Sequence, residues 1–113
     1  MATNFSMFAG DDKTIQVTVT DPDGDPVDLT SATIKWQAAK SLGKASAISK
    51  STSSGITITD AANGEFEVTI LDTDTDDLVG TYQHEAEVTF TDGTKSTVLS
   101  GTMRINPVVI EAT

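Results

Sequence analysis

The chain has 113 residues, with 17 acidic and 7 basic side chains and a formal net charge of −10. Its length fits one domain, expected over 1–113, rather than two. The acidic excess argues against nucleic acid or an anionic membrane as partner, since both are bound through Lys and Arg. The absence of Cys excludes a disulfide framework, and no apolar run reaches the roughly 18 residues of a membrane span.

The first third of the chain predicts strands separated by turns. An edge strand is expected at 3–9. Residues 13–20 alternate between apolar and polar and predict a half-buried strand. A turn follows at 21–26 (DPDGDP), because Pro presets φ, Gly accepts a positive φ and Asp side chains bond the nearby backbone. The chain is then expected to return briefly over 27–29.

The middle of the chain predicts one core strand and one exposed strand. The core strand is expected at 32–39 and carries Trp36, the only Trp, which we place at the centre of the core. Residues 40–54 are small and polar and predict a loop around a short edge strand near 46–50. The Lys residues of this segment would protect such an edge from pairing with another chain.

The second half predicts two further strands and an acidic corner. The strands are expected at 55–60 and 65–71, joined by a turn at 61–64 that contains Asn-Gly. The acidic corner at 71–78 (LDTDTDDL) is interpreted as solvated turns with a helix N-cap. It leads through Gly80 into the longest alternating run of the chain.

A long hairpin is expected near the C-terminus, with strands at 82–90 and 95–105. Asp92-Gly93 between two alternating runs favours a two-residue type I′ turn. Pro107 would end the pairing, because Pro has no N–H to donate. The residues expected to face the core share the apolar phase of the alternating runs: Ile15, Val17, Val19, Val27, Leu29, Ala32, Ile34, Trp36, Ala38, Ile56, Ile58, Phe66, Val68, Ile70, Tyr82, His84, Ala86, Val88, Phe90, Leu99, Gly101, Met103 and Ile105.

Seven to eight short strands and no sustained helical period predict an all-β fold, namely an immunoglobulin-like β-sandwich of antiparallel strands. Tyr82 stands just after the acidic corner, where such sandwiches hold a tyrosine whose hydroxyl bonds the corner backbone. The core is expected to span about 10–106. The Cys…Trp…Cys spacing of antibody domains is absent.

Candidate chemical sites have more ordinary interpretations. Asp21, Asp23, Asp25 and Asp28 resemble half of a calcium loop, but the spacing of an EF-hand fails at Gly24 and no Glu stands at 32. The acidic corner is a second oxygen-rich cluster, for which capping is the stronger interpretation. His84 is the only His and shares the core face, away from nearby acids, and no nucleophile motif or phosphate loop occurs. We therefore expect no enzymatic activity, no metal and no cofactor.

Apolar residues at both ends of the chain lie outside the core pattern. They pack on the domain itself or form a surface that docks on another subunit. The segment 107–113 is accordingly interpreted as a C-terminal docking tail. The candidate partner-docking residues are Phe5, Met7, Phe8, Val108, Val109 and Ile110.

Several motifs together are similar to those of small phage domains. They share turn-and-strand patterns in the same order: IQVTVTD (15–21), GDPVDL (24–29), ATIKW (32–36), GITITD (55–60), GEF (64–66), LVGTY (78–82), DG (92–93) and LSGT (99–102). Over about 10–106 the chain resembles the N-terminal domain of phage baseplate upper proteins and the small immunoglobulin-like proteins of tailed-phage structural gene clusters.

The resemblance implies a virion structural protein, a decoration, joining or adaptor module on the capsid, neck or baseplate. Its partners would be other virion proteins, met in a symmetric, multi-copy assembly. Since the helical linker of baseplate upper proteins is missing after the domain, a decorating or joining role is favoured. The first residues show no secretory signal, which fits a protein that leaves the cell inside a particle. The alternative is a module that binds host-surface glycan or protein, through loops such as 40–54.

Overall fold

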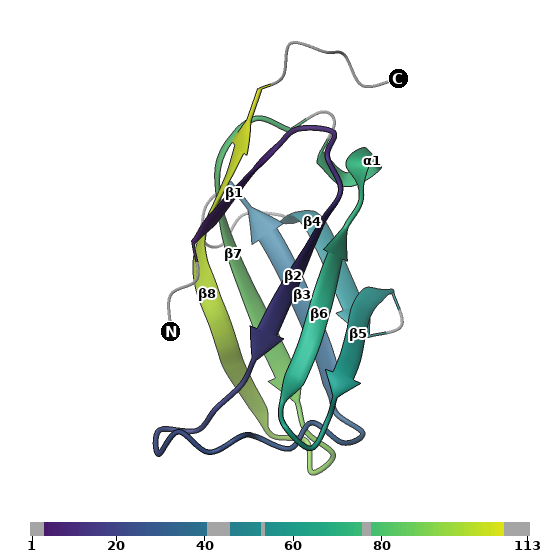
Figure 1. Ribbon diagram of the computed structural model, residues 1–113, viewed down its shortest axis with the longest axis vertical. Coiled ribbons are helices and arrows are strands. Elements are labelled where there is room, and N and C mark those ends of the chain that lie inside the picture. Colours follow the sequence, from purple (N-terminus) through teal and green to yellow (C-terminus); the bar gives the residue numbers. More distant parts are fainter. Residues whose placement is uncertain (1–3, 41–45, 53, 76–77, 108–113) are drawn as a thin grey trace.

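The computed structural model describes residues 4–40, 46–52, 54–75 and 78–107. These residues form eight strands and one short helix (Figure 1). In chain order the elements are β1 (Phe5–Phe8), β2 (Lys13–Thr18), β3 (Thr33–Ala39), β4 (Ser46–Thr52), β5 (Gly55–Asp60), β6 (Glu65–Ile70), α1 (Asp72–Thr75), β7 (Gly80–Thr89) and β8 (Lys95–Asn106). No helix in this part of the chain is long and apolar enough to cross a membrane.

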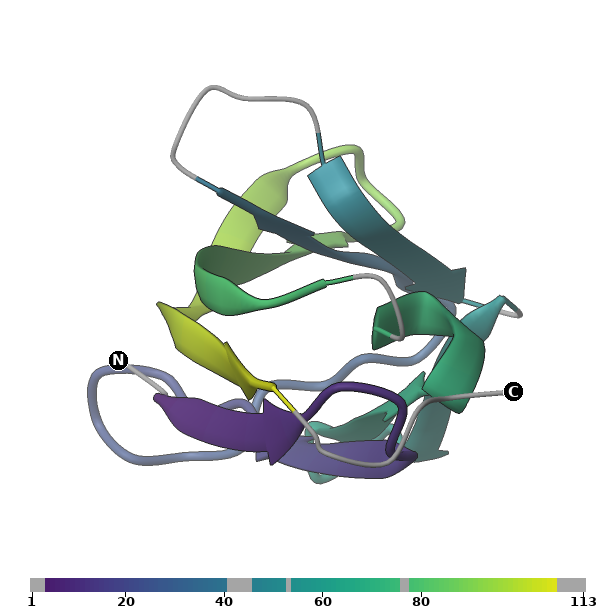
Figure 2. The ribbon, with the colours of Figure 1, turned by 90° about the horizontal axis from the view of Figure 1, so that it is seen from above.

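The eight strands form one mixed sheet in the order β1-β8-β7-β3-β4-β5-β6-β2. The sheet curls around its core into a nearly closed, barrel-like shape (Figure 2). The prediction of an all-β fold is confirmed, whereas the prediction of purely antiparallel strands is wrong. Strands β1 and β8 run parallel, as do β4 and β5. Alternation reports which side of a strand is buried, and it carries no signal for the direction of the neighbouring strand.

Strand β4 lies inside the sheet, so the predicted edge strand near 46–50 is wrong. Its neighbours are β3 on one side and β5 on the other. The Lys50 ammonium makes an ion pair with Asp74, at 2.6 Å from the carboxylate, and its side chain is only 11% exposed. This Lys therefore links β4 to α1, while the two true edges of the sheet are β1 and β2.

The predicted inward faces are confirmed. Leu29, Ile34, Trp36 and Val68 have no exposed surface, and Trp36 is the largest fully buried side chain. Val27, Ile58 and Phe90 are partly buried and pack against this core. A buried face of this kind fixes the register of each strand, because a shift by one residue would turn its apolar side chains to water.

The long hairpin is confirmed, but the predicted two-residue type I′ turn is wrong. The Phe90 N–H donates to the Thr94 carbonyl (2.8 Å), and the Gly93 N–H donates to the Phe90 carbonyl (2.9 Å). Gly93 has φ +90°, whereas Asp92 does not have a positive φ. A type I′ turn needs positive φ at both central residues, so the connection is a three-residue loop that ends in a left-handed Gly.

A buried side-chain hydrogen bond joins the neighbouring strands β3 and β7. The Trp36 indole N–H donates to Nδ1 of His84 (3.1 Å), and His84 is 2% exposed. The imidazole must therefore keep Nδ1 unprotonated. The Phe5 ring stands edge-on to the His84 ring, with 5.0 Å between ring centroids, so the same His also anchors the edge strand β1.

We expect a double-mutant cycle of Trp36→Phe and His84→Leu to give a coupling free energy of about 1 kcal/mol, because either change breaks the same buried bond. His84→Leu alone leaves the indole N–H without its acceptor and should cost about 1–3 kcal/mol. Urea denaturation of the four proteins measures both quantities. Additive effects would show that the bond does not contribute to the free energy of unfolding.

Gly64 lies in the turn between β5 and β6, where its backbone approaches the backbone of Val19 and Val27 closely. Its carbonyl accepts from the Val19 N–H at 2.8 Å. A Cβ at this position would stand 2.6 Å from the Val19 carbonyl oxygen and 2.7 Å from that of Val27, and φ is +71°. Both neighbours are backbone atoms, which cannot rotate away as a side chain would.

Gly64→Ala should lower the free energy of unfolding by about 2–4 kcal/mol, through the backbone clash and the strained φ together. Gly93→Ala is the matched control, since Gly93 has φ +90° but no heavy atom within 4 Å of the added Cβ. It should cost only the backbone strain, about 1–2 kcal/mol. Equal losses for the two variants in urea denaturation would contradict the close approach at Gly64.

Candidate functional site

The sheet stays open along one side, between its two edge strands. Strand β1 pairs with β8 only over 103–106, and β2 pairs with β6 on its other side. Residues 95–101 of β8 therefore have no strand partner on the side away from β7 within the described chain. In Figure 1, β1 crosses the upper part of the space between β8 and β2, and no labelled strand crosses the lower part. We call this lower part the seam.

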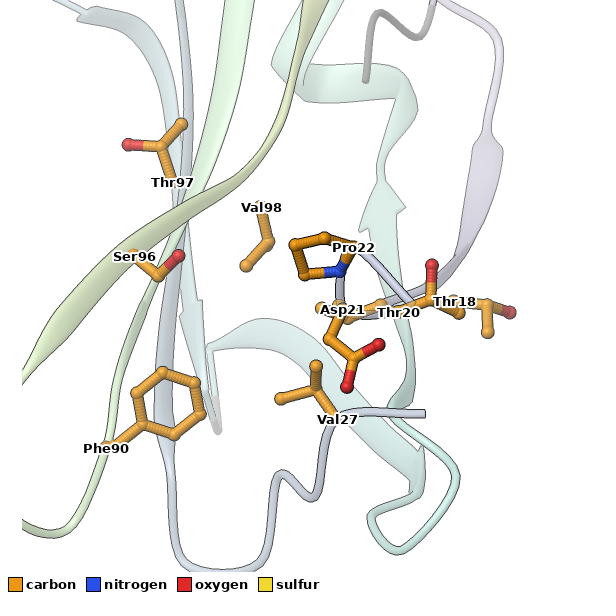
Figure 3. A pocket seen from close by; sticks show the side chains of 10 residues that line it. Thr18, Thr20, Asp21, Pro22, Val27, Phe90, Ser96, Thr97 and Val98 are labelled. Atoms are coloured by element: carbon orange, nitrogen blue, oxygen red, sulfur yellow. The ribbon is translucent and has the colours of Figure 1, made fainter. Parts of the chain in front are cut away.

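A groove of about 320 Å³ occupies the seam. One wall is the end of β2 and the turn after it, and the other wall is the first part of β8 (Figure 3). Val27 and Phe90 lie at the lower end of the groove in this view. The full lining is Thr18, Val19, Thr20, Asp21, Pro22, Val27, Phe90, Ser96, Thr97 and Val98. The groove thus combines apolar side chains with the free edge of a strand.

A β-bulge in β8 shapes one wall of the groove. Ala86 pairs with Leu99, but the next residue, Glu87, pairs with Thr97. Val98 is therefore an extra residue without a partner on β7, and it lines the groove. A bulge bends its strand and redirects the side chains around it. Here the bulge leaves Val98 half-buried in the seam, in addition to Leu99 in the core.

The end of the barrel below the seam is acidic. Its three described loops, 19–32, 60–64 and 90–94, contain Asp but neither Lys nor Arg. Asp21 uses one carboxylate oxygen to accept from the Asp23 N–H (2.9 Å) and the Asp25 N–H (3.0 Å). The structure thereby confirms the predicted turn, in which Asp side chains bond the nearby backbone, and shows that Asp21 is one such Asp. Among the described residues no group of three or more His, Cys, Asp or Glu is placed to hold a metal ion.

Two carboxylates at this end have a lowered pKa, each because a Thr donates to it. The Thr94 hydroxyl and then the Thr94 N–H hold the pKa of Asp92 below its ordinary value. The hydroxyl and N–H of Thr30 do the same for Asp28. The Thr94 hydroxyl lies 2.6 Å from the Asp92 carboxylate. Both groups are exposed, and each stays ionised to a lower pH than an ordinary Asp carboxyl.

The predicted docking residues of the N-terminal strand separate into three environments. Met7 is 6% exposed and belongs to the core. Phe5 is half-buried against His84, with the Lys13 ammonium 5.9 Å from its ring centroid. Phe8 is 52% exposed and is the only one of the three on the surface. Val108, Val109 and Ile110 lie outside the described residues.

Three exposed apolar side chains lie toward the opposite end of the barrel from the loops 19–32, 60–64 and 90–94. The exposed large apolar side chains of the described chain are Phe8, Leu71 and Val79, at 52%, 47% and 50% exposure. All three stand where β1, β6 or the approach to β7 reaches this end (Figure 1). Phe8 pairs with Asn106, and Gly80, next to Val79, pairs with Ile105. We call Phe8, Leu71 and Val79 the apolar end.

Sequence reasoning found Phe8 but missed the other surfaces. Leu71 was counted as part of the acidic corner and Val79 was not singled out as a docking residue, and only the tertiary structure brings both to the end that carries Phe8. Val98 had no sequence signal, because the bulge at this residue interrupts an otherwise even alternation. The hydroxyl bond of the predicted tyrosine corner stays a prediction, since 76–77 lie outside the described residues; Tyr82 itself is buried at 3% exposure.

No protein-family model matches the chain, and the curated proteins give no significant match.

The carboxyl resonances of Asp92 and Asp28 should titrate below the ordinary value of 3.8 in an NMR pH series. A carboxylate whose pKa is depressed by folding stabilises the protein above its unfolded pKa and loses that contribution as pH falls through its folded pKa. Thr94→Val should raise the pKa of Asp92 toward 3.8 and leave Asp28 unchanged, and Thr30→Val should do the reverse. A common shift of both carboxyls in either variant would contradict this local cause.

Proposed function

We propose that this protein is an immunoglobulin-like structural module of a phage virion, which decorates or joins larger subunits of the particle. The proposal starts from the resemblance over about 10–106. It is supported by an all-β scaffold that carries three exposed apolar side chains toward one end, next to the Asp residues of 11–12 and α1, and Asp-containing loops at the other. The apolar end is the observation that carries it, because large exposed apolar side chains gathered at one end of a domain are typical of surfaces that bind other proteins.

The strand order supports the immunoglobulin-like part of the proposal. Strands β8-β7-β3-β4 follow the G-F-C-C′ order of one sheet in such sandwiches, and β2-β6-β5 follow the B-E-D order of the other. Among the described strands, the two groups are joined by hydrogen-bonded pairing only where Ser51 and Thr52 of β4 pair with β5. The barrel-like sheet then corresponds to two layers joined by this short pairing. Strand β1 differs from a constant-type first strand, since it pairs with β8 instead of β2.

The apolar end also lies beside both predicted docking segments. Phe8 pairs with Asn106, and the Ala9 N–H donates to the Asn106 carbonyl at 2.9 Å. Asn106 is two positions before Val108 in sequence. An exposed side chain of the first strand and the start of the segment 107–113 therefore belong to one region of the surface. A subunit that binds this end would contact the end of β1 and the end of β8 together, which fits a module bound to an assembly.

The second candidate is a module that binds host-surface glycan or protein. The seam groove favours it, because a groove of about 320 Å³ with Ser and Thr hydroxyls on its wall has the size and polarity of a small-ligand site. This candidate predicts that the purified protein adsorbs to host cells. The virion module predicts no adsorption by the isolated protein, and incorporation into particles instead.

Deletion of 107–113 and the double variant Phe8→Asp/Val79→Asp should each reduce incorporation into particles at least tenfold, because the docking surface loses apolar area or gains charge. Thr91→Asp, at the exposed tip of the opposite end, is the matched control and should be incorporated normally. Quantitative mass spectrometry of purified particles measures the copy number. Normal incorporation of both test variants, with unchanged melting temperatures, would exclude the apolar end as the docking surface.

A further inference from the structure

We infer that the seam accepts an extended segment of a partner protein, which adds to β8 as a further strand and carries Lys or Arg beside its apolar residues. This site is separate from the apolar end and does not depend on the proposed function. It begins with the backbone. Over 95–101, β8 offers alternate N–H and C=O groups on the side away from β7, and no described strand uses them. A free edge of this kind is a template for strand addition.

The upper limit of the site is set by the N-terminal segment. The Thr102 N–H donates to the Asn4 side chain at 2.9 Å, and β1 takes over the edge of β8 from Met103 onward. The free edge therefore ends at about 101. Below it, seven residues of β8 remain, which span roughly 23 Å at about 3.3 Å per residue. A segment of about five to seven residues fits this length.

The groove gives an added strand somewhere to place its side chains. Successive side chains of a strand point to opposite faces, so every second residue of the segment would point inward. The inward side is lined by Val27, Phe90 and Val98, with Pro22 on the far wall (Figure 3). These side chains favour β-branched or other apolar residues at alternate positions of the partner. The outward positions would face water and favour polar residues.

The charge of the surroundings determines the flanks of the partner segment. The loops at this end carry six Asp residues, namely Asp21, Asp23, Asp25, Asp28, Asp60 and Asp92, which outnumber the base Lys95 at the first position of β8. Opposite charges across an interface speed association and select partners. A Lys or Arg at one end of the segment would be attracted by the carboxylates of these loops. A second copy of the chain fits poorly, since each copy carries a net charge of −10.

The test is a selection from a displayed library of random heptapeptides, carried out on the folded protein. Enriched peptides should alternate apolar and polar residues and contain Lys or Arg. A synthetic copy of one such peptide should shift the amide resonances of 95–101 and of 18–21 in NMR spectra. Its affinity should fall at least tenfold in Val98→Lys, and severalfold in Asp23→Asn/Asp25→Asn.

Two controls separate strand addition from other binding. Thr20→Lys changes an exposed residue on the opposite wall and should also lower the affinity for the peptide. It replaces Val98→Lys in the test if that variant fails to fold. Val79→Lys makes the same substitution at the apolar end and should leave the affinity for the peptide unchanged. Conversely, Val98→Lys should leave the incorporation of the protein into particles unchanged. Two versions of the peptide, methylated at the odd or at the even backbone nitrogens, test the backbone pairing. The version that keeps the N–H groups facing β8 should bind normally, and the affinity of the other should fall at least tenfold.

Three results would overturn the inference. The first is a library in which no peptide is enriched on the protein relative to Val98→Lys. The second is equal binding of both methylated peptides, which would mean that side chains alone fill the groove. The third is a concentration-dependent dimer that is lost in Val98→Lys, which would make a second copy the occupant.

Discussion

A sheet that curls around one core must bring its two edge strands together, and here the edge strand β1 is only four residues long. It covers the upper part of β8 and leaves residues 95–101 without a described neighbour. The large core side chains are nevertheless buried, since Trp36 is 0% and Phe66 1% exposed. The short edge strand therefore leaves an open seam without exposing the core.

The position of β1 depends in turn on the core. Phe5 packs edge-on against His84, and His84 accepts the hydrogen bond from Trp36 at the centre of the barrel. One buried imidazole thus joins strands β1, β7 and β3. A loss of this contact would loosen the edge strand first, and with it Phe8 and the apolar end. The proposed docking surface consequently rests on the same hydrogen bond that helps to order the core.

Much of the fold was predictable from alternation and turn chemistry, which act over a few residues. The inward faces of β2, β3, β6 and β7 and the Asp21 turn follow directly from them. The interior position of β4 does not follow from them, because a Lys such as Lys50 is typical of an edge strand. Here Lys50 instead forms an ion pair with Asp74. The predicted turn type of the hairpin was wrong, because Asp-Gly is also compatible with a type I turn followed by a left-handed Gly.

The sequence by itself determined an acidic, all-β domain, the sides of its strands and the site of most turns. These depend on local periods and on backbone preferences of single residues. Only the tertiary structure decided which strands are neighbours, which pairs run parallel, where β8 bulges and where the sheet stays open. It also placed Phe8, Leu71 and Val79 at one end and the Asp-rich loops at the other. Such pairings join residues far apart in the chain, and alternation is the same whichever partner a strand finds.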